Sequence, residues 1–371
     1  MDDFDFLEDD VFGKVTELPK GQRSEFTAWH RPRKQWVRSC QWKNSLISLA
    51  RKREYQNVEE LNYFGFPGAD CLDVRVLGKA LYGENKKLCY YGLETKEENA
   101  VRAQAVTESL LHDTPYISEK SRIEASSQFE LLKATNSKLT AEVIAREPFN
   151  IINLDFVDSV LTGPDTMPAL SNLLRYQFER QYLPWMLFLT TRYDLQANPI
   201  ESLQNYVGVL EANLNEHPEF NSSVNTEVFG VDPSTTWDQT ALLEQDGCFE
   251  SVFLLSFLKW ILKNAHSNNI RMRLHPIADY KVRELNEKND MCSLVIEFIK
   301  VNQPNDATGV IQAISILESE LNFALRIVSR VTGIKDVDAL LNEEPELFDR
   351  MKSEMVSLLD DCGYVIDRYP F

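Results

Sequence analysis

The chain has 371 residues, 43% hydrophobic and 26% charged, which is typical of a globular protein with one large or two ordinary domains. Its formal net charge of −18 argues against uniform attraction to nucleic acid, and no apolar run approaches the roughly 20 residues that cross a bilayer. The six cysteines are scattered without zinc-ligand spacing, so we expect a reduced, cytoplasmic protein without a structural metal.

The first 25 residues combine acids with aromatic side chains. Residues 2–10 hold six carboxylates and no base, with Phe4 and Phe6 between them. A secretion signal would be basic at this point, so we expect a flexible, solvated tail. The alternative is a short motif that docks on a protein partner or on the chain's own basic segment.

Residues 26–54 form a basic segment. From Arg33 onward, Trp36, Cys40 and Ile47 can share one side of a helix, which predicts an amphipathic helix with much of its charge in solvent. One interpretation is that this helix caps the next domain. The other is a basic, aromatic surface for the phosphates or an unstacked base of nucleic acid, formed by Arg31, Arg33, Lys34 and Arg38.

Residues 61–94 follow the order of a nucleotide-binding βαβ unit. A short apolar run breaks into Gly65-Phe66-Pro67-Gly68, a helix that Asp70 is placed to cap follows, and a second apolar run ends on Glu94. The glycines allow close approach to a ligand, and an acid at the second strand's tip can accept hydrogen bonds from ribose hydroxyls. The turn can also be purely structural, and Glu94 can instead stabilise a helix amino terminus.

Strands and helices alternate through the following residues. After strands at 61–66 and 88–93, we expect strands at 122–129, 149–155 and 184–189. The expected helices are 97–111, 137–146, 168–181, 200–214 and 239–265. The runs 270–280 and 291–301, joined by the polar residues 284–290, predict an antiparallel hairpin. Only helices are expected after it, at 309–331, 336–341 and 345–361.

This order predicts an α/β fold, with a Rossmann-like, mostly parallel sheet of about seven strands, an antiparallel hairpin edge and helical extensions at both ends. We expect an acidic tail at 1–25, the basic helical segment at 26–54, the Rossmann-like domain at 55–303 and a helical extension at 304–371. Asp155 is the one carboxylate of its apolar strand and ends it. An acid at the end of a strand, at the ligand-binding edge of the sheet, has few structural roles, so we predict a functional role for Asp155.

The order of elements resembles the class I S-adenosylmethionine-dependent methyltransferase superfamily over residues 55–301. The run Asn62-Tyr63-Phe64-Gly65-Phe66-Pro67-Gly68 is similar to the D-L-F-A-G-P-G type of first motif in three-Cys-motif partner proteins. The run Asn153-Leu154-Asp155-Phe156 likewise resembles their strand-four segment. No proline follows Asp155, in contrast to the DNA enzymes that methylate amino groups, so we do not expect that activity.

The resemblance implies that S-adenosylmethionine binds beside the ends of the first three strands. The implied cofactor residues are Asn62, Gly65, Pro67, Gly68, Glu94, Ser127 and Gln128. The glycine turn would lie under the methionine part, Glu94 would hold the ribose hydroxyls, and Ser127 and Gln128 would lie beside the adenine. Asn62 stands where the superfamily usually has an acid. Asp155 would face the methyl group and the acceptor.

Two hypotheses follow for the function. The first is a cytoplasmic S-adenosylmethionine-dependent methyltransferase, in which Asp155 orients or deprotonates the acceptor and the basic segment guides an anionic acceptor such as nucleic acid. The second is a catalytically degenerate subunit of a protein assembly, for example in bacterial anti-phage defence. It would bind a protein partner through the acidic tail or the C-terminal helices.

Overall fold

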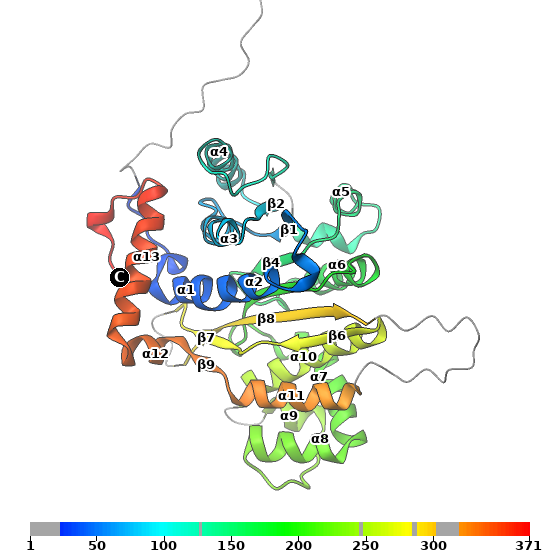
Figure 1. Ribbon diagram of the computed structural model, residues 1–371. Helices are drawn as coiled ribbons and strands as arrows, with labels where there is room; N and C mark the ends of the chain where they lie inside the picture. Colours follow the sequence, from blue (N-terminus) through cyan, green and yellow to red (C-terminus); the bar gives the residue numbers. More distant parts are fainter. Residues whose placement is uncertain (1–22, 126–127, 245–247, 284–287, 302–318) are drawn as a thin grey trace, which may run out of the picture.

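The computed structural model describes residues 23–125, 128–244, 248–283, 288–301 and 319–371 (Figure 1). Most of the predicted acidic tail lies outside these ranges. The strands are β1 (Glu60–Gly65), β2 (Lys87–Glu94), β3 (Arg122–Ala125), β4 (Ile151–Asp155), β5 (Trp185–Arg192), β6 (Ile270–Leu274), β7 (Ala278–Tyr280), β8 (Met291–Lys300) and β9 (Lys335–Asp336).

The α-helices are α1 (Pro32–Trp36), α2 (Lys43–Ala50), α3 (Leu72–Tyr82), α4 (Glu97–Asp113), α5 (Lys138–Ala145), α6 (Thr166–Arg180), α7 (Ile200–Glu216), α8 (Pro218–Ser223), α9 (Gln239–Glu244), α10 (Phe249–Ser267), α11 (Glu320–Thr332), α12 (Val337–Glu343) and α13 (Pro345–Asp361). Short 3-10 turns are η1 (Ala28–His30), η3 (Arg53–Tyr55), η4 (Phe129–Lys133) and η6 (Ile366–Arg368). Two π-helical turns are η2 (Val37–Trp42), which joins α1 to α2, and η5 (Val224–Phe229).

One sheet contains these strands in the order β3-β2-β1-β4-β5-β8-β7-β9, with β6 also paired to β8. The pairs from β3 to β5 are parallel, whereas β8 runs antiparallel to β5, β6 and β7, so the predicted fold class is confirmed. The first arm of the hairpin is interrupted at residues 275–277 and pairs with β8 in two pieces. Chain order reverses between β1 and β4, and such a switch point is where open α/β sheets bind ligands.

The two faces of β5 explain its uniformly apolar sequence. Every residue of Trp185–Arg192 is buried. Successive side chains point to opposite faces, so Leu187 belongs to one apolar cluster and Phe188 to the other. Both faces are covered by helices: Figure 1 shows α1, α2 and α3 on one side of the sheet and α7, α10 and α11 on the other.

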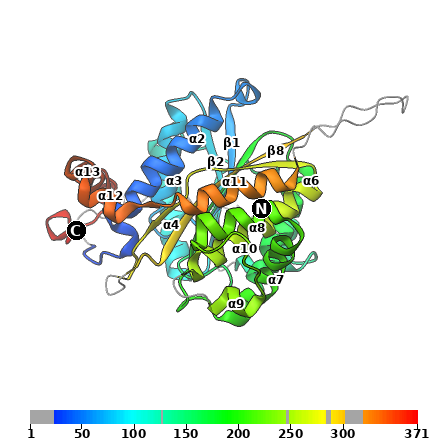
Figure 2. The ribbon, with the colours of Figure 1, turned by 90° about the horizontal axis from the view of Figure 1, so that it is seen from below.

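The C-terminal helices divide between these two sides. α11 packs on α10, with Ile327 and Val328 in the cluster on that face. α12 and α13 instead pack beside α1, with Val337 and Met351 in the opposite cluster, and Figure 2 shows this pair apart from α11. β9, which the sequence did not predict, pairs with β7. The proposed domain boundaries stay predictions.

Several elements differ from those predicted. The strand expected at 122–129 ends at Ala125, because Ala125 pairs with Glu94, the last residue of β2, which is its neighbour among the described strands. The helix expected at 239–265 is divided into α9 and α10, and the residues between them lie partly outside the described ranges. α8 and both π-helical turns were not predicted.

Gly65 permits the close approach of β1 to β4. A Cβ atom at this position would overlap the backbone oxygen of Asn153. We expect Gly65→Ala to lower the free energy of unfolding by about 1–3 kcal/mol, because the two strands must separate. Urea titrations should compare it with Gly83→Ala, where the nearest contact is 3.3 Å and φ is −61°. Equal effects of the two substitutions would contradict this explanation.

Candidate functional site

A cavity of about 640 Å³ lies at the carboxyl edge of the parallel strands. Its lining includes Pro67 and Gly68 after β1, Glu94 at the end of β2, and Asp155 at the end of β4. The volume is in the roughly 300–1,000 Å³ range of small-molecule sites, and the position is the switch point of the sheet. Four residues predicted for the site are therefore brought together in one cavity.

The turn after β1 is held close against β2. Gly68 has φ of +64°, a conformation that other residues rarely adopt, and a Cβ there would meet nothing within 4 Å. The Pro67 ring packs against Gly92 of β2, where an added Cβ would lie 2.7 Å from Cγ. The turn thus presents backbone, with open space beside Gly68, to any ligand at this edge.

An aromatic wall, formed by Phe66, Phe129 and Phe156, lines the same cavity. The three rings contact one another edge to face, with centroids 5.3–5.9 Å apart. Phe66 and Phe156 directly follow β1 and β4, and Phe129 begins η4 after β3, so the group is assembled from segments distant in sequence and was not predicted. Such rings offer a surface on which a planar heterocycle can pack.

The other predicted cofactor residues lie elsewhere. The Asn62 amide donates to Glu147 and the residue does not line the cavity, because it lies three positions before the end of β1. Gly65 is required by strand packing and is not part of the lining. Gln128 is exposed outside the lining, and Ser127 lies outside the described residues.

Asp155 is bound by a lysine from the amino-terminal helix. The Lys34 ammonium donates to Asp155 Oδ1 at 2.6 Å and to the Tyr280 hydroxyl at 3.4 Å, and it lies 4.5 Å from the Trp42 ring centroid. Thr190 also donates to Asp155. Burial lowers the pKa of Lys34, although Asp155 opposes this effect. Both charged groups line the cavity, with 4% of the lysine side chain and 20% of the aspartate side chain exposed.

A second buried ion pair lies beside the first. Arg38 Nε donates to Asp73 Oδ1 at 2.5 Å, and both side chains are at most 4% exposed. Asn153 donates to the other oxygen of Asp73. Burial raises the pKa of Asp73, and Arg38 counteracts this shift. Lys34 and Arg38 are four residues apart and so share one helix face.

The basic segment therefore does not leave these charges in solvent, which corrects the expectation from its helical pattern. Lys34 and Arg38 point inward, Arg33 pairs with Asp338 at 2.9 Å, and Arg31 lies over the Phe371 ring. All four bases assigned to nucleic acid contact groups of this chain. The nucleic-acid partner itself stays a prediction.

The roof of the cavity is made of residues 23–30 and is held by the end of the chain. Arg23 forms a parallel β-bridge with Tyr364, and the Tyr369 hydroxyl donates to the carbonyl oxygen of His30 at 2.6 Å. Phe26 packs against the rings of both tyrosines. Residues from the two ends of the described chain thus close one side of the site.

Asp70 links this roof to the turn after β1. It accepts hydrogen bonds from Arg23, Arg102 and the Tyr364 hydroxyl. Although burial acts to raise it, Arg102 and Arg23 lower the pKa of Asp70. The predicted helix cap is wrong: Cys71 precedes α3 with φ of 50°, and no side chain caps the helix. The distant partners outcompete the local capping bond.

His30 presents an unpaired donor beside Asp70. Its Nδ1 accepts the Thr27 backbone N–H at 3.2 Å, which assigns the proton of the neutral ring to Nε2. Nε2 is buried without a hydrogen-bond partner among the described residues and lies 4.0 Å from Asp70 Oδ2. Burial, with a contribution from Arg38, lowers the pKa of His30 to about 4.

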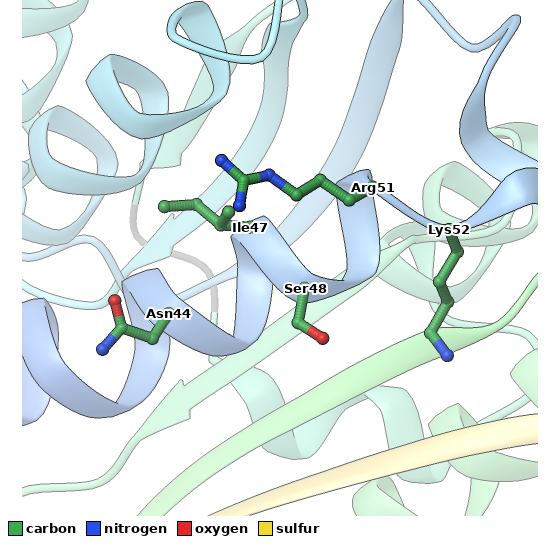
Figure 3. A pocket seen from close by; sticks show the side chains of 5 residues that line it. All are labelled: Asn44, Ile47, Ser48, Arg51 and Lys52. Carbon is green, nitrogen blue, oxygen red and sulfur yellow. The ribbon is translucent and has the colours of Figure 1, made fainter.

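A second hollow, of about 540 Å³, lies along α2 (Figure 3). Its lining is Asn44, Ile47, Ser48, Arg51 and Lys52, all from one helix and its end. Arg51 pairs with Glu84, and Lys52 pairs with Glu297. Because no second element of the described chain lines it, this hollow lacks the enclosing geometry of the cavity at the strand ends.

The described residues contain neither a cluster of metal ligands nor a membrane-spanning helix. No group of three or more His, Cys, Asp or Glu side chains among them is arranged to hold a metal ion. In the same ranges, no helix is long and apolar enough to cross a membrane.

The family model described as PP_RS20740-like matches residues 23–370. No protein with a curated description matches the sequence. Similar solved structures include the magnesium protoporphyrin IX methyltransferase of Synechocystis PCC 6803 with bound S-adenosylhomocysteine, at 11% identity over 72% of this chain and 86% of that chain, with a TM-score of 0.34.

Two further solved structures are an rRNA methylase of Streptococcus thermophilus and an arsenic(III) S-adenosylmethionine methyltransferase of Chlamydomonas reinhardtii. Both are 12% identical to this chain. The first alignment covers 71% of this chain and 97% of that chain, with a TM-score of 0.33. The second covers 70% and 74%, with a TM-score of 0.36.

Proposed function

The chain belongs to the PP_RS20740-like family, and we propose that it binds S-adenosylmethionine at the strand-edge cavity and transfers the methyl group to an acceptor. One observation carries this proposal. Pro67, Gly68, Glu94 and Asp155 come from the ends of three neighbouring parallel strands and line a single cavity. A glycine turn beside an acidic strand end is the arrangement by which such sheets hold nucleosides.

The lining suits each part of this ligand. Glu94 Oε1 accepts the Lys96 N–H at 3.1 Å, and a carboxylate has capacity for ribose hydroxyls as well. The aromatic wall of Phe66, Phe129 and Phe156 would pack against the adenine. The open space beside Gly68 suits the methionine part.

The residues around Asp155 would position the acceptor. S-adenosylmethionine supplies a methyl group that already carries its leaving group, so a protein need only align an acceptor and exclude water. Asp155 is fixed by Lys34 and Thr190, which suits it to orient a donor group of the acceptor. A nucleic-acid acceptor, cytoplasmic location and the finer resemblance to three-Cys-motif partner proteins remain parts of the proposal.

Calorimetric titration with S-adenosylhomocysteine tests the proposal. We expect the wild-type protein to bind, and Glu94→Ala to weaken binding by about tenfold, since hydrogen bonds to a charged group contribute about 1.5–3 kcal/mol. Glu59→Ala is the matched control, because Glu59 is exposed just before β1, at the opposite edge of the sheet. Absence of binding at millimolar ligand would remove the proposal.

A degenerate subunit is the second candidate, and one observation favours it. Asp155 and Asp73, the carboxylates at the end of β4 and in the first turn of α3, are both engaged by bases of the same chain. The protein would then act through a protein partner, as in an anti-phage assembly. Co-purification of a stoichiometric partner, lost on deletion of residues 1–25, supports this role. A lone monomer that converts S-adenosylmethionine to S-adenosylhomocysteine contradicts it.

A further inference from the structure

Lys34 is placed where it cancels the charge of Asp155. Its ammonium is enclosed by the Asp155 carboxylate, the Tyr280 hydroxyl and the Trp42 ring. The adjacent Arg38–Asp73 pair is also neutral as a unit. The floor of the cavity therefore carries two bases and two acids in contact, and no net charge.

The order of strands would bring this floor near the sulfur of the proposed ligand. β1 lies between β2 and β4, so the strand ends follow one another as Glu94, the turn at Pro67 and Gly68, and Asp155. Neighbouring strands are about 4.8 Å apart. If Glu94 holds the ribose hydroxyls, the ribose ring and its 5′-methylene would extend over β1 and bring the sulfur toward β4. This step rests on the proposed function.

Charge then distinguishes the two forms of the ligand. S-adenosylmethionine carries a positive sulfonium, whereas S-adenosylhomocysteine has a neutral thioether at the same atom. A carboxylate without a partner would favour the sulfonium, and an ammonium without a partner would favour the thioether. A carboxylate that stabilised the sulfonium would also hold the reactant more tightly than the transition state, in which the positive charge on sulfur declines.

We propose that Lys34 sets the selectivity of this site between S-adenosylmethionine and S-adenosylhomocysteine by neutralising Asp155. With the pair intact, the cavity floor favours neither the sulfonium nor the neutral thioether. Lys34 is thus a specificity-determining residue for the ligand, and its effect does not depend on which acceptor the protein uses.

The test is a pair of calorimetric titrations, with S-adenosylmethionine and S-adenosylhomocysteine, on each variant. The measured quantity is the Kd for S-adenosylhomocysteine divided by the Kd for S-adenosylmethionine. We expect Lys34→Met to raise this ratio by about tenfold, and Asp155→Asn to lower it by about tenfold, relative to the wild type. The double variant Lys34→Met/Asp155→Asn should return the ratio to the wild-type value.

Lys86→Met is the matched control. Lys86 is also a buried lysine, but its partners are the carbonyl oxygens of Tyr55 and Val58, and it lies before β2 at the other edge of the sheet. It should lose stability without any change in the ratio. Circular dichroism establishes which variants fold. Where Lys34→Met does not fold, the opposite shift expected for Asp155→Asn decides the question.

The outcomes separate this inference from the proposed function. If the wild-type protein binds neither ligand, the proposed function fails and the inference fails with it. If both ligands bind and the charge variants leave the ratio within twofold of the wild type, the proposed function stands and the role of Lys34 is overturned. A shift of the same sign in Lys34→Met and Asp155→Asn would also overturn it.

Discussion

Replacing Arg38 with methionine is expected to lower the free energy of unfolding by about 3–5 kcal/mol. The substitution leaves the Asp73 carboxylate buried without its ionic partner, and it removes the hydrogen bond from Arg38 to the carbonyl oxygen of Trp29. Breaking one side of a buried pair is costly because the remaining charge is shielded from water and has lost its hydrogen-bonded counter-ion. Urea-induced unfolding, followed by circular dichroism, measures the effect.

Two variants test whether burial of the unpaired charge causes this loss of stability. Arg51→Met removes an ion pair of similar geometry, at 2.7 Å from Glu84, but the arginine side chain is 67% exposed, so the expected loss is about 0–1 kcal/mol. Arg38→Met/Asp73→Asn removes both buried charges and should recover much of the stability lost in the single variant. Equal losses for Arg38→Met and Arg51→Met would mean that burial does not determine the cost.

The second large effect is expected on acidification and involves His30. Its pKa is about 4 in the folded protein and 6.5 without the protein environment, because burial and Arg38 disfavour the charged ring. Between these values the unfolded chain binds a proton that the folded chain does not, so folding stability decreases as pH falls from about 6.5 to 4. The shift corresponds to a contribution of about 3 kcal/mol.

His30→Gln removes this titration and should therefore flatten the acid side of the stability curve. Urea unfolding of wild type and variant at several pH values between 4 and 7 gives the difference. The comparison with the variant is necessary because titration of Asp279 changes the folding stability in the direction opposite to that of His30. Burial raises the pKa of Asp279 to about 6, so its contribution to stability decreases as pH rises through the same interval. Parallel curves for wild type and His30→Gln would exclude the assigned role of His30.

The sheet and part of the site could be predicted because they follow from local patterns. The apolar run at 184–189 predicts a strand buried on both faces, and β5 is such a strand. Glu94 and Asp155 each end an apolar run, and parallel strands bring their carboxyl ends to one edge. Once the order of the strands was predicted, it was sufficient to predict that these two acids lie close together.

The amino-terminal half of the site could not be predicted, because it depends on contacts distant in sequence. Helical spacing identified one apolar side of the basic helix, but α3, α13 and β8 pack around this segment and also bury Lys34 and Arg38. Lys34 reaches Asp155 across 121 residues. Asp70 followed the rule for a helix cap, yet Arg102 and Tyr364 supply stronger partners from elsewhere in the chain.

The β-bridge between Arg23 and Tyr364 determines when the roof of the cavity can form during synthesis of the chain. A ribosome makes the chain from its amino end, so residues 23–30 emerge long before Tyr364 and Tyr369, which hold them in place. The nascent chain can pair β1 with β2 and β4 while its last helices are still missing. The roof over the strand ends is therefore secured only after residues 364–369 have been made, later than the strands that it covers.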